Sequence, residues 1–290
     1  MRKPAARMFS HPVRFLCTVF ALLTLTASAP AQVDDFVRLS QEKAAENLQA
    51  FRNYRLSGDF CFQFVIIHQQ RRGDEETRFN GKMWGTWGKG GPLFRVEIQQ
   101  DGKPTSPIHR FLLQSGPQPE LWIVDAQGNP VRSKSAAQTP LFPGLIFTPF
   151  ELQTPFSYWP EARYLRTVRF KGRPTHLYRM TPPADFQKAN PGISYVQLGF
   201  DRTYNALMQA VIFDAKEKPL RYLEAESFAK VQEQYIPEEI RLRDAVTRDR
   251  DLFRVTAAAL NLRLDRAIFT PEALHQPAPL PAAEFFTTID

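Results

Sequence analysis

The sequence predicts a mainly β (α+β) protein: a meander-like antiparallel sheet with one long N-terminal helix and one helical insertion midway. Three observations lead to this prediction. Beyond residue 59, apolar residues alternate with a period of two in one segment after another. Short turns rich in Gly, Pro and Asp separate these segments. The chain also holds 24 prolines, which disfavour long helices, and 24 phenylalanines, which favour a large aromatic core.

The first 31 residues have the three parts of a secretory signal peptide. A basic start without acidic residues contains Arg2, Lys3, Arg7 and Arg14. The apolar run 15–25 follows, and it is shorter than the roughly 20 residues that span a bilayer. Ala29 and Ala31 then suit a cleavage site. We expect export to the periplasm with cleavage near Ala31, the alternative being an uncleaved anchor.

Beyond the signal peptide at 1–31, we expect one β domain at 32–274 and a Pro-rich C-terminal tail at 275–290. A helix is predicted over 35–53, with Asp34 and Asp35 at its positive end. Its apolar stripe has helical spacing and consists of Val37, Ala44, Leu48 and Phe51. The tail is expected to be extended and loosely held.

The predicted strands place rows of large apolar side chains on one face of the sheet. The first row, within residues 60–67, is Phe60, Phe62, Phe64 and Ile66. A second row, within residues 93–99, is Phe94, Val96 and Ile98. Regular hairpins resume after residue 160, and a capped turn at 270–274 ends the series.

The segment 135–160 breaks the alternation and carries one charge, Glu151. It contains five prolines and a group of large apolar side chains that includes Phe147, Phe150, Phe156 and Trp159. Thr148 and Glu151 have the spacing of a capping box, with Pro149 at the first helical position. We therefore expect short helical turns that act as an apolar lid.

The sequence offers no enzyme motif. It lacks a nucleophile elbow, the H-E-x-x-H zinc motif, a P-loop and the dinucleotide glycine fingerprint. The five histidines are scattered singly, and Cys61 is the one cysteine left after the signal peptide. We expect no catalytic residue, no metal site and no cofactor.

Charge argues against nucleic-acid binding. The formal net charge is +7, and four of these positive charges belong to the signal peptide, which leaves +3. No basic stripe with interleaved aromatics is present. The mixed run 241–251 is interpreted as a solvated hairpin with cross-strand ion pairs. Its alternative is an arginine patch for lipid head groups or a protein partner.

The apolar rows leave two interpretations open. A curved sheet with a concave apolar face, partly closed by helices, can enclose a ligand cavity. The same phenylalanines can instead form a dry core. Composition alone does not decide between these interpretations.

Two stretches carry a resemblance to a known family. One is 147–160; the other runs from Tyr204-Asn205-Ala206-Leu207 through Ile236-Pro237 to Phe269-Thr270-Pro271-Glu272-Ala273-Leu274. The second resembles the C-terminal half of outer-membrane lipoprotein-sorting proteins of the LolA-like superfamily. The likeness covers about 70 residues firmly and most of the mature chain loosely. It implies an open antiparallel β-barrel of about ten or eleven strands, covered by an N-terminal helix and a short helical lid, with a hydrophobic cavity for acyl chains.

The first functional hypothesis is a periplasmic carrier for lipid or lipoprotein acyl chains that takes part in lipoprotein sorting. The two apolar rows and the four aromatic lid residues would line its cavity. The alternative is an envelope sensor or scaffold of the same fold, related to anti-sigma-factor regulators, which binds an envelope membrane protein. That alternative predicts an interior filled by side chains.

Overall fold

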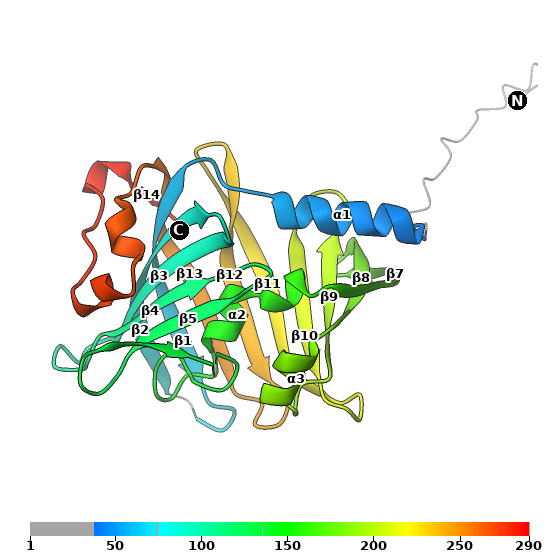
Figure 1. Cartoon of the computed structure of the whole chain (residues 1–290), viewed down its shortest axis with the longest axis horizontal. Helices are drawn as coiled ribbons and strands as arrows, with labels where there is room; N and C mark the ends of the chain where they lie inside the picture. The colour runs from blue at the N-terminus through cyan, green and yellow to red at the C-terminus, as the bar shows by residue number, and fades with distance from the viewer. Residues whose placement is uncertain (1–37, 74, 135, 290) are drawn as a thin grey trace, which may run out of the picture. The chain divides into compact units, whose positions relative to one another are not determined.

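A computed structural model describes residues 38–73, 75–134 and 136–289 of the chain. The predicted signal peptide, Asp34, Asp35 and Val37 lie outside these residues. All described strands belong to one 14-stranded antiparallel sheet (Figure 1). Thirteen follow the order β6-β5-β4-β3-β2-β1-β13-β12-β11-β10-β9-β8-β7, and β14 pairs with β13.

The bounds of the elements are as follows. The strands are β1 (Asp59–Gln69), β2 (Glu76–Gly88), β3 (Gly91–Gln100), β4 (His109–Gln114), β5 (Glu120–Val124), β6 (Pro130–Ser133), β7 (Glu161–Phe170), β8 (Arg173–Thr181), β9 (Tyr195–Asp201), β10 (Leu207–Phe213), β11 (Pro219–Val231), β12 (Gln234–Asp244), β13 (Arg250–Leu262) and β14 (Thr287–Thr288). The helices are α1 (Gln41–Asn53), α2 (Pro149–Gln153), α3 (Ala184–Ala189) and the 3₁₀ turns η1 (Pro155–Tyr158), η2 (Arg266–Phe269), η3 (Glu272–His275) and η4 (Ala283–Phe285). None of the helices in the described part of the chain has the length and apolar character needed to cross a membrane.

The mainly β, antiparallel prediction is confirmed, but its details need correction. The sheet has 14 strands rather than ten or eleven, and its edge strands β6 and β7 do not pair with each other, so it is not closed into a barrel. The sequence does not predict β6, which begins at Pro130, or the two-residue β14. Both are too short to show an alternation of apolar and polar residues, and they are strands because they pair with β5 and β13.

The predicted start of the first helix is wrong. The helix α1 begins at Gln41 rather than at residue 35, because Ser40 has extended backbone angles and its side chain accepts a hydrogen bond from the Lys43 amide. The capping box of α2 is confirmed: the Glu151 carboxylate accepts from the Thr148 amide at 2.9 Å, and the Thr148 hydroxyl accepts from Phe150. The short helix α3 is an addition to the predicted elements.

The sheet has a separate apolar cluster on each face. The larger cluster lies on the concave face and includes Ala44 and Leu48 of α1 together with the segment 136–159. In Figure 1, α2 lies within the curve of the sheet. The smaller cluster lies on the convex face of β1–β5, where Cys61, Trp84 and Leu112 pack against Phe269 and Leu274. The N-terminal half of the sheet is therefore covered on both faces.

The C-terminal tail is not loosely held. Ala278 is 9 % exposed, its amide donates to the Glu97 carboxylate at 2.8 Å, and the Trp84 indole donates to the Pro279 carbonyl at 3.0 Å. The Ile289 amide also donates to the Thr256 carbonyl. Prolines remove donors from this tail, yet several of its remaining amides and carbonyls pair with the sheet, which fixes its path across the convex face.

Candidate ligand-binding interior

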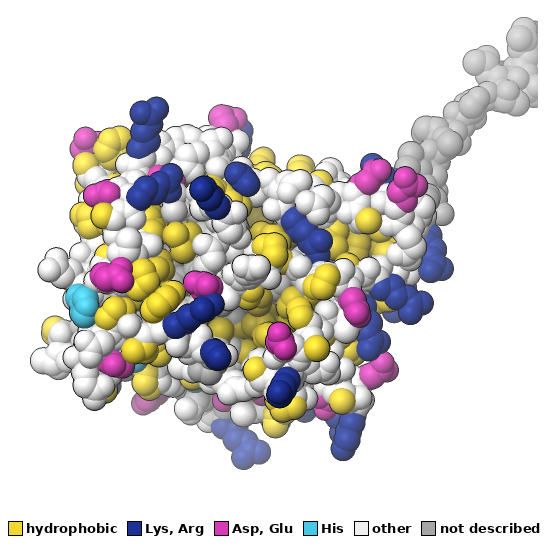
Figure 2. Space-filling model, in the orientation of Figure 1, with side chains coloured by type: hydrophobic (Ala, Val, Ile, Leu, Met, Phe, Trp, Pro, Cys, Tyr) yellow, Lys and Arg dark blue, Asp and Glu magenta, His cyan; other side chains and the backbone are white. Residues whose placement is uncertain are grey.

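The predicted cavity residues all belong to the concave cluster. Ten of the eleven expose at most 8 % of their surface, and the other, Phe94, is partly buried against the same cluster. The ten are Phe60, Phe62, Phe64, Ile66, Val96, Ile98, Phe147, Phe150, Phe156 and Trp159. Figure 2 shows hydrophobic side chains gathered in the middle of this face. The structure thus brings these side chains together in one cluster, and their role as ligand contacts stays a prediction.

The inward-facing row of β1, Phe60, Phe62, Phe64 and Ile66, is called the floor below. Two glycines of β2 make room for its aromatic rings. Gly81 pairs with Phe64 and Gly85 pairs with Phe60 across β1 and β2. A Cβ atom on Gly81 would lie 2.1 Å from the Phe64 ring, and one on Gly85 would lie 2.0 Å from the Phe60 ring. Each ring therefore lies flat across the neighbouring strand. Phe60 also stacks on Phe62, with ring centroids 4.5 Å apart.

The segment 136–160, called the lid below, fills the space above this floor with its own side chains. Its buried apolar members are Ala137, Leu141, Phe142, Leu145, Phe147, Phe150, Phe156 and Trp159. Phe150 meets Phe156 edge-on and stacks against Phe186 of α3. The interior is therefore occupied by protein side chains in this conformation.

One buried carboxylate holds the N-terminal part of the lid. Asp251 of β13 is fully buried, and its Oδ2 accepts from the Ile146 and Phe147 amides at 2.8 Å each. Its Oδ1 is 2.7 Å from His68 Nδ1 on β1. The hydrogen bond to Asp251 raises the pKa of His68, and this effect exceeds the lowering caused by burial. The His68 imidazole thus supports the carboxylate on which the lid backbone rests.

Two arginines hold the helical part of the lid. Arg52 at the end of α1 donates to the Ser157 carbonyl at 2.7 Å and to the Trp159 carbonyl at 2.8 Å. Burial lowers the pKa of this guanidinium. Arg221 of β11 donates to Glu151 at 2.7 Å, where the Glu151 side chain is completely buried. The capping carboxylate of α2 is therefore also a salt-bridge partner.

The side-chain amide of Gln153 fixes the lid to the β4–β5 connection. Gln153 donates through Nε2 to the Gln114 carbonyl at 2.9 Å and to the Glu120 carbonyl at 2.7 Å. The Ser115 hydroxyl donates to the Gln153 carbonyl. The lid is consequently attached to α1, β11, β13 and the β4–β5 connection, through polar contacts around an apolar centre.

A cleft of about 650 Å³ lies between α1 and the strands β7 and β8. Tyr164 and Tyr178 are on its wall, and the Tyr178 hydroxyl donates to the Ala44 carbonyl at 3.0 Å. The Tyr164 hydroxyl accepts from the Leu39 amide and lies 2.9 Å from the Thr167 hydroxyl. None of the eleven predicted cavity residues lines this cleft.

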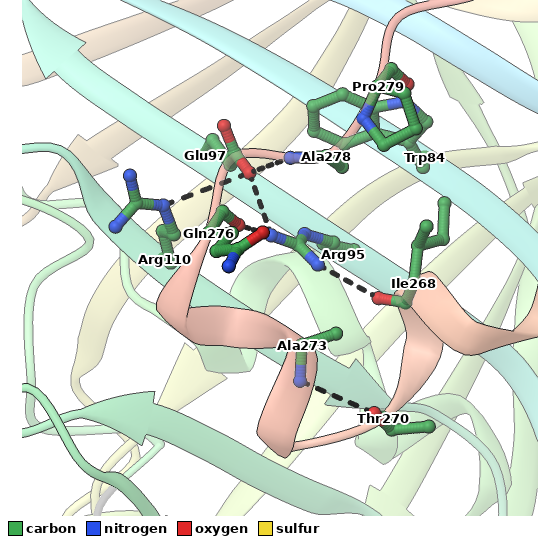
Figure 3. Close-up of polar contacts among 10 residues, drawn as sticks. All are labelled: Trp84, Arg95, Glu97, Arg110, Ile268, Thr270, Ala273, Gln276, Ala278 and Pro279. Carbon is green, nitrogen blue, oxygen red and sulfur yellow. Dashed lines mark hydrogen bonds and ion pairs between the residues drawn. The ribbon is translucent and has the colours of Figure 1, made fainter.

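On the convex face, a buried arginine holds the tail (Figure 3). Arg95 is 1 % exposed and donates to the Ile268 carbonyl at 3.1 Å, to Glu97 at 3.0 Å and to the Gln276 carbonyl. The Glu97 carboxylate in turn accepts from the Ala278 amide. Burial lowers the pKa of Arg95, opposed by the charge of Glu97. This network, called the clasp below, binds the backbone at Ile268, Gln276 and Ala278.

The sequence does not predict the contacts of several of these residues. Asp251 lies in the run interpreted as a solvated hairpin, and Arg95 and Glu97 alternate with the apolar row of β3 as solvent-facing residues do. The rest of that run forms the β12–β13 hairpin, in whose turn Asp244 accepts from the Val246 and Thr247 amides. The ion pair of Arg241, with Glu226 at 3.1 Å, reaches β11 instead of crossing this hairpin. The available signal for Asp251 was its position opposite His68 in the paired strands, which needs the topology.

Reactive chemistry is sparse in the part of the chain that the structure describes. Among those residues, no group of three or more His, Cys, Asp or Glu side chains could hold a metal ion. Cys61 is fully buried on the convex face, and burial raises its pKa to about 12, so the thiolate nucleophile is disfavoured.

Comparisons with known proteins agree with the fold. No protein with a curated description matches the sequence. A domain assigned to outer membrane lipoprotein sorting from Vibrio parahaemolyticus superposes with a TM-score of 0.68 at 15 % identity, covering 82 % of this chain and 100 % of that one. A DUF1329 family protein from Desulfovibrio piger gives 0.66 at 13 % identity, with 81 % and 98 % covered. A LolA superfamily protein from Nitrosomonas europaea gives 0.59 at 14 % identity, with 80 % and 98 % covered.

The sequence comparison identifies a family over more than half of the chain. Residues 111–276 match a family model described as "Uncharacterized protein"-like, a match that extends from β4 to η3 and includes the lid. The structural likeness extends the comparison to the strands that precede this range. The chain belongs to this "Uncharacterized protein"-like family, and its fold is LolA-like.

Proposed function

We propose that this chain is an exported, periplasmic binding protein that holds lipid acyl chains between the lid and the floor of the sheet. The observation that carries the proposal is the lid itself. It is a charge-poor segment with a buried aromatic centre, and it rests on a floor that is also aromatic. Transfer of lipids or lipoproteins towards the outer membrane is the role we propose for it, in keeping with the LolA-like fold.

Energetics restrict how a ligand can enter. Burying one large apolar side chain is worth about 1.5–3 kcal/mol, so exposing the seven largest of the lid would cost on the order of 10–20 kcal/mol. A C16 acyl chain contributes about 13 kcal/mol, at roughly 0.8 kcal/mol per CH₂. Burial of the acyl chain therefore only offsets the exposure of the lid, and a ligand that expelled the lid into water would gain little net affinity. The ligand has to slide under the lid, whose rings repack on the chain and stay buried.

The attachments of the lid suit such a movement. The lid is held to the rest of the molecule by polar contacts at Gln138, at Ile146–Phe147, at Glu151–Gln153 and at Ser157–Trp159. The phenyl rings between these points are held by apolar contacts alone. Releasing one attachment leaves the others in place. We infer that the lid moves as a hinged unit, with Arg52 or Asp251 as the contact that yields first.

Native mass spectrometry of the protein purified from periplasm without detergent tests the proposal. Adducts identified by extraction as phospholipid or acylated peptide would support it. An apo mass that takes up no added lipid would refute it.

Substitutions then locate the site by binding of a fluorescent fatty acid. Phe62→Asp in the floor and Phe150→Asp in the lid should abolish binding, whereas Phe285→Asp should not, because Phe285 is 51 % exposed. Circular dichroism would show that each variant is folded. Full binding by a folded Phe62→Asp protein would contradict the interior as the site.

The filled interior favours one second candidate. A chain whose floor is covered by stacked rings is also what an envelope sensor or scaffold with a protein partner would have. In that case, a membrane protein co-purifies stably with the chain and no lipid is extracted. The mass measurement above therefore separates the two functions.

A further inference from the structure

We propose that the α1 end of the sheet is a docking surface for an anionic phospholipid bilayer. The α1 end is defined by α1 and by the loops at 54–58, 89–90, 115–119, 134, 171–172, 202–206, 232–233 and 263–265. The strand pairing places all of these loops at one end of the antiparallel sheet, which is the upper end in Figure 1. This inference does not require the interior to bind lipid.

Charge is distributed unequally between the two ends of the sheet. The loops of the α1 end carry six basic residues, Arg55, Lys89, Lys134, Lys171, Arg202 and Arg263, against two acidic ones, Glu233 and Asp265. The described residues of the loops at the opposite end carry seven basic and seven acidic residues. The helix α1 is neutral, with two residues of each sign. The positive excess therefore belongs to one end.

Four of these cations are available to an external anion. Arg55, Lys89, Lys134 and Arg263 are exposed, and none of them takes part in an ion pair between residues that the structure describes. The Arg55 guanidinium lies 5.1 Å from the centre of the Trp87 ring, which leaves its charge unpaired. They come from loops next to β1, β2, β6 and β13, so they span the rim instead of forming one pocket.

Three exposed tyrosines lie at the same end. Tyr54, Tyr204 and Tyr235 are 58 %, 68 % and 56 % exposed. The Tyr204 and Tyr235 ring centroids are 6.3 Å apart, and the Arg173 guanidinium lies 5.2 Å from the Tyr204 ring. Tyrosine has an apolar ring and a polar tip, and it is enriched where proteins meet the head-group region of a bilayer.

A bilayer fits this surface better than a protein partner does. The four cations are spread around the rim of the sheet, and none of them lines the cleft beside α1. Such a spread matches an extended array of negative charge. Each Lys or Arg near an anionic leaflet strengthens binding about fivefold. Four cations together therefore convert negligible binding into binding that vesicle sedimentation detects, and salt should weaken it.

Co-sedimentation with vesicles tests the inference. The protein, purified without detergent, is mixed with phosphatidylcholine vesicles that contain or lack 30 % phosphatidylglycerol. The matched variants are R55Q/K89Q/K134Q/R263Q at the α1 end and R71Q/R72Q/K103Q/K216Q at the opposite end, which remove the same charge. All four positions of the control variant are exposed.

We expect binding to the anionic vesicles alone, a loss of at least 100-fold in the α1-end variant, and a loss of less than fivefold in the control. Y204S/Y235S should weaken binding while leaving its salt dependence intact. Equal losses in the two charge variants would overturn the docking surface, since they would indicate non-specific attraction. No sedimentation of the unchanged protein would also overturn it, and would leave acyl-probe binding by the interior unaffected.

Discussion

The two faces of β1–β3 are both buried, but the segments that cover them are held in different ways. On the concave face, the lid covers aromatic rings and is attached by polar contacts at several points along its length. On the convex face, the Arg95–Glu97 pair binds the backbone at Ile268 and at the start of the tail, at Gln276 and Ala278. An apolar contact can repack on a ligand, whereas a buried ion pair tolerates little displacement. Both faces contain such pairs, Arg95–Glu97 under the tail and Arg221–Glu151 under the lid. The part that can adapt is therefore the set of aromatic rings between the lid's attachments, and the convex face belongs to the fixed frame.

The largest expected effect concerns the clasp. Arg95→Met removes the nearer cation of the buried Glu97 carboxylate and leaves it Arg110 at 3.9 Å, so the free energy of unfolding should fall by about 3 kcal/mol. Urea unfolding measures it, with Arg254→Gln as control. Arg254 pairs with Glu239 at 2.6 Å but is 45 % exposed, and its loss should cost less than about 1 kcal/mol. Equal losses for the two variants would remove the distinction between frame and surface.

The next effect tests the rigidity of the concave floor. Gly81→Ala should force the Phe64 ring out of its position across β2 and cost about 1–3 kcal/mol by overpacking. The double variant Gly81→Ala with Phe64→Leu should recover part of that loss, because a shorter side chain leaves the new methyl group room. Gly128→Ala is a control for strain without crowding, since its Cβ would meet nothing within 4 Å. Additive losses in the double variant would contradict the proposed contact.

A smaller effect is expected in the lid. Thr148→Ala removes the cap of α2 and should destabilise this helix by about 0.5–2 kcal/mol. Hydrogen exchange of the lid amides should accelerate, while the amides of β3 keep their rates because the clasp is intact. Faster exchange in β3 as well would show that the lid and the frame open together, which would contradict their independent attachment.

The sequence predicts which side chains face the same way, but not what covers them. Phe60, Phe62 and Phe64 alternate along one strand, so their common face follows from the backbone alone. The Thr148–Glu151 capping box is equally local. Asp251 binds amides about 100 residues away, and such contacts leave no pattern along the chain.

The burial of the convex face could not be predicted from the sequence for the same reason. The alternation of β3 places Arg95 and Glu97 opposite its apolar row, as it would in a solvated strand. Whether that face meets water depends on the tail, which lies more than 170 residues later. Sequence periodicity therefore gave the orientation of each side chain, and the tertiary fold determined its burial.

The smallest effect is pH dependence of the lid attachment. The hydrogen bond to Asp251 raises the pKa of His68, so the stability it contributes is complete below its ordinary value of about 6.5 and is lost as pH rises through the raised value. Burial lowers the pKa of His109 and His176, whose contributions are lost as pH falls below about 6.5. The range above 6.5 therefore isolates His68. There, exchange of the Ile146 and Phe147 amides should accelerate with pH beyond its intrinsic base catalysis, and His68→Gln should abolish this excess. An excess that survives in the variant would place the titrating group elsewhere, and Asp251 would then hold the lid without help from His68.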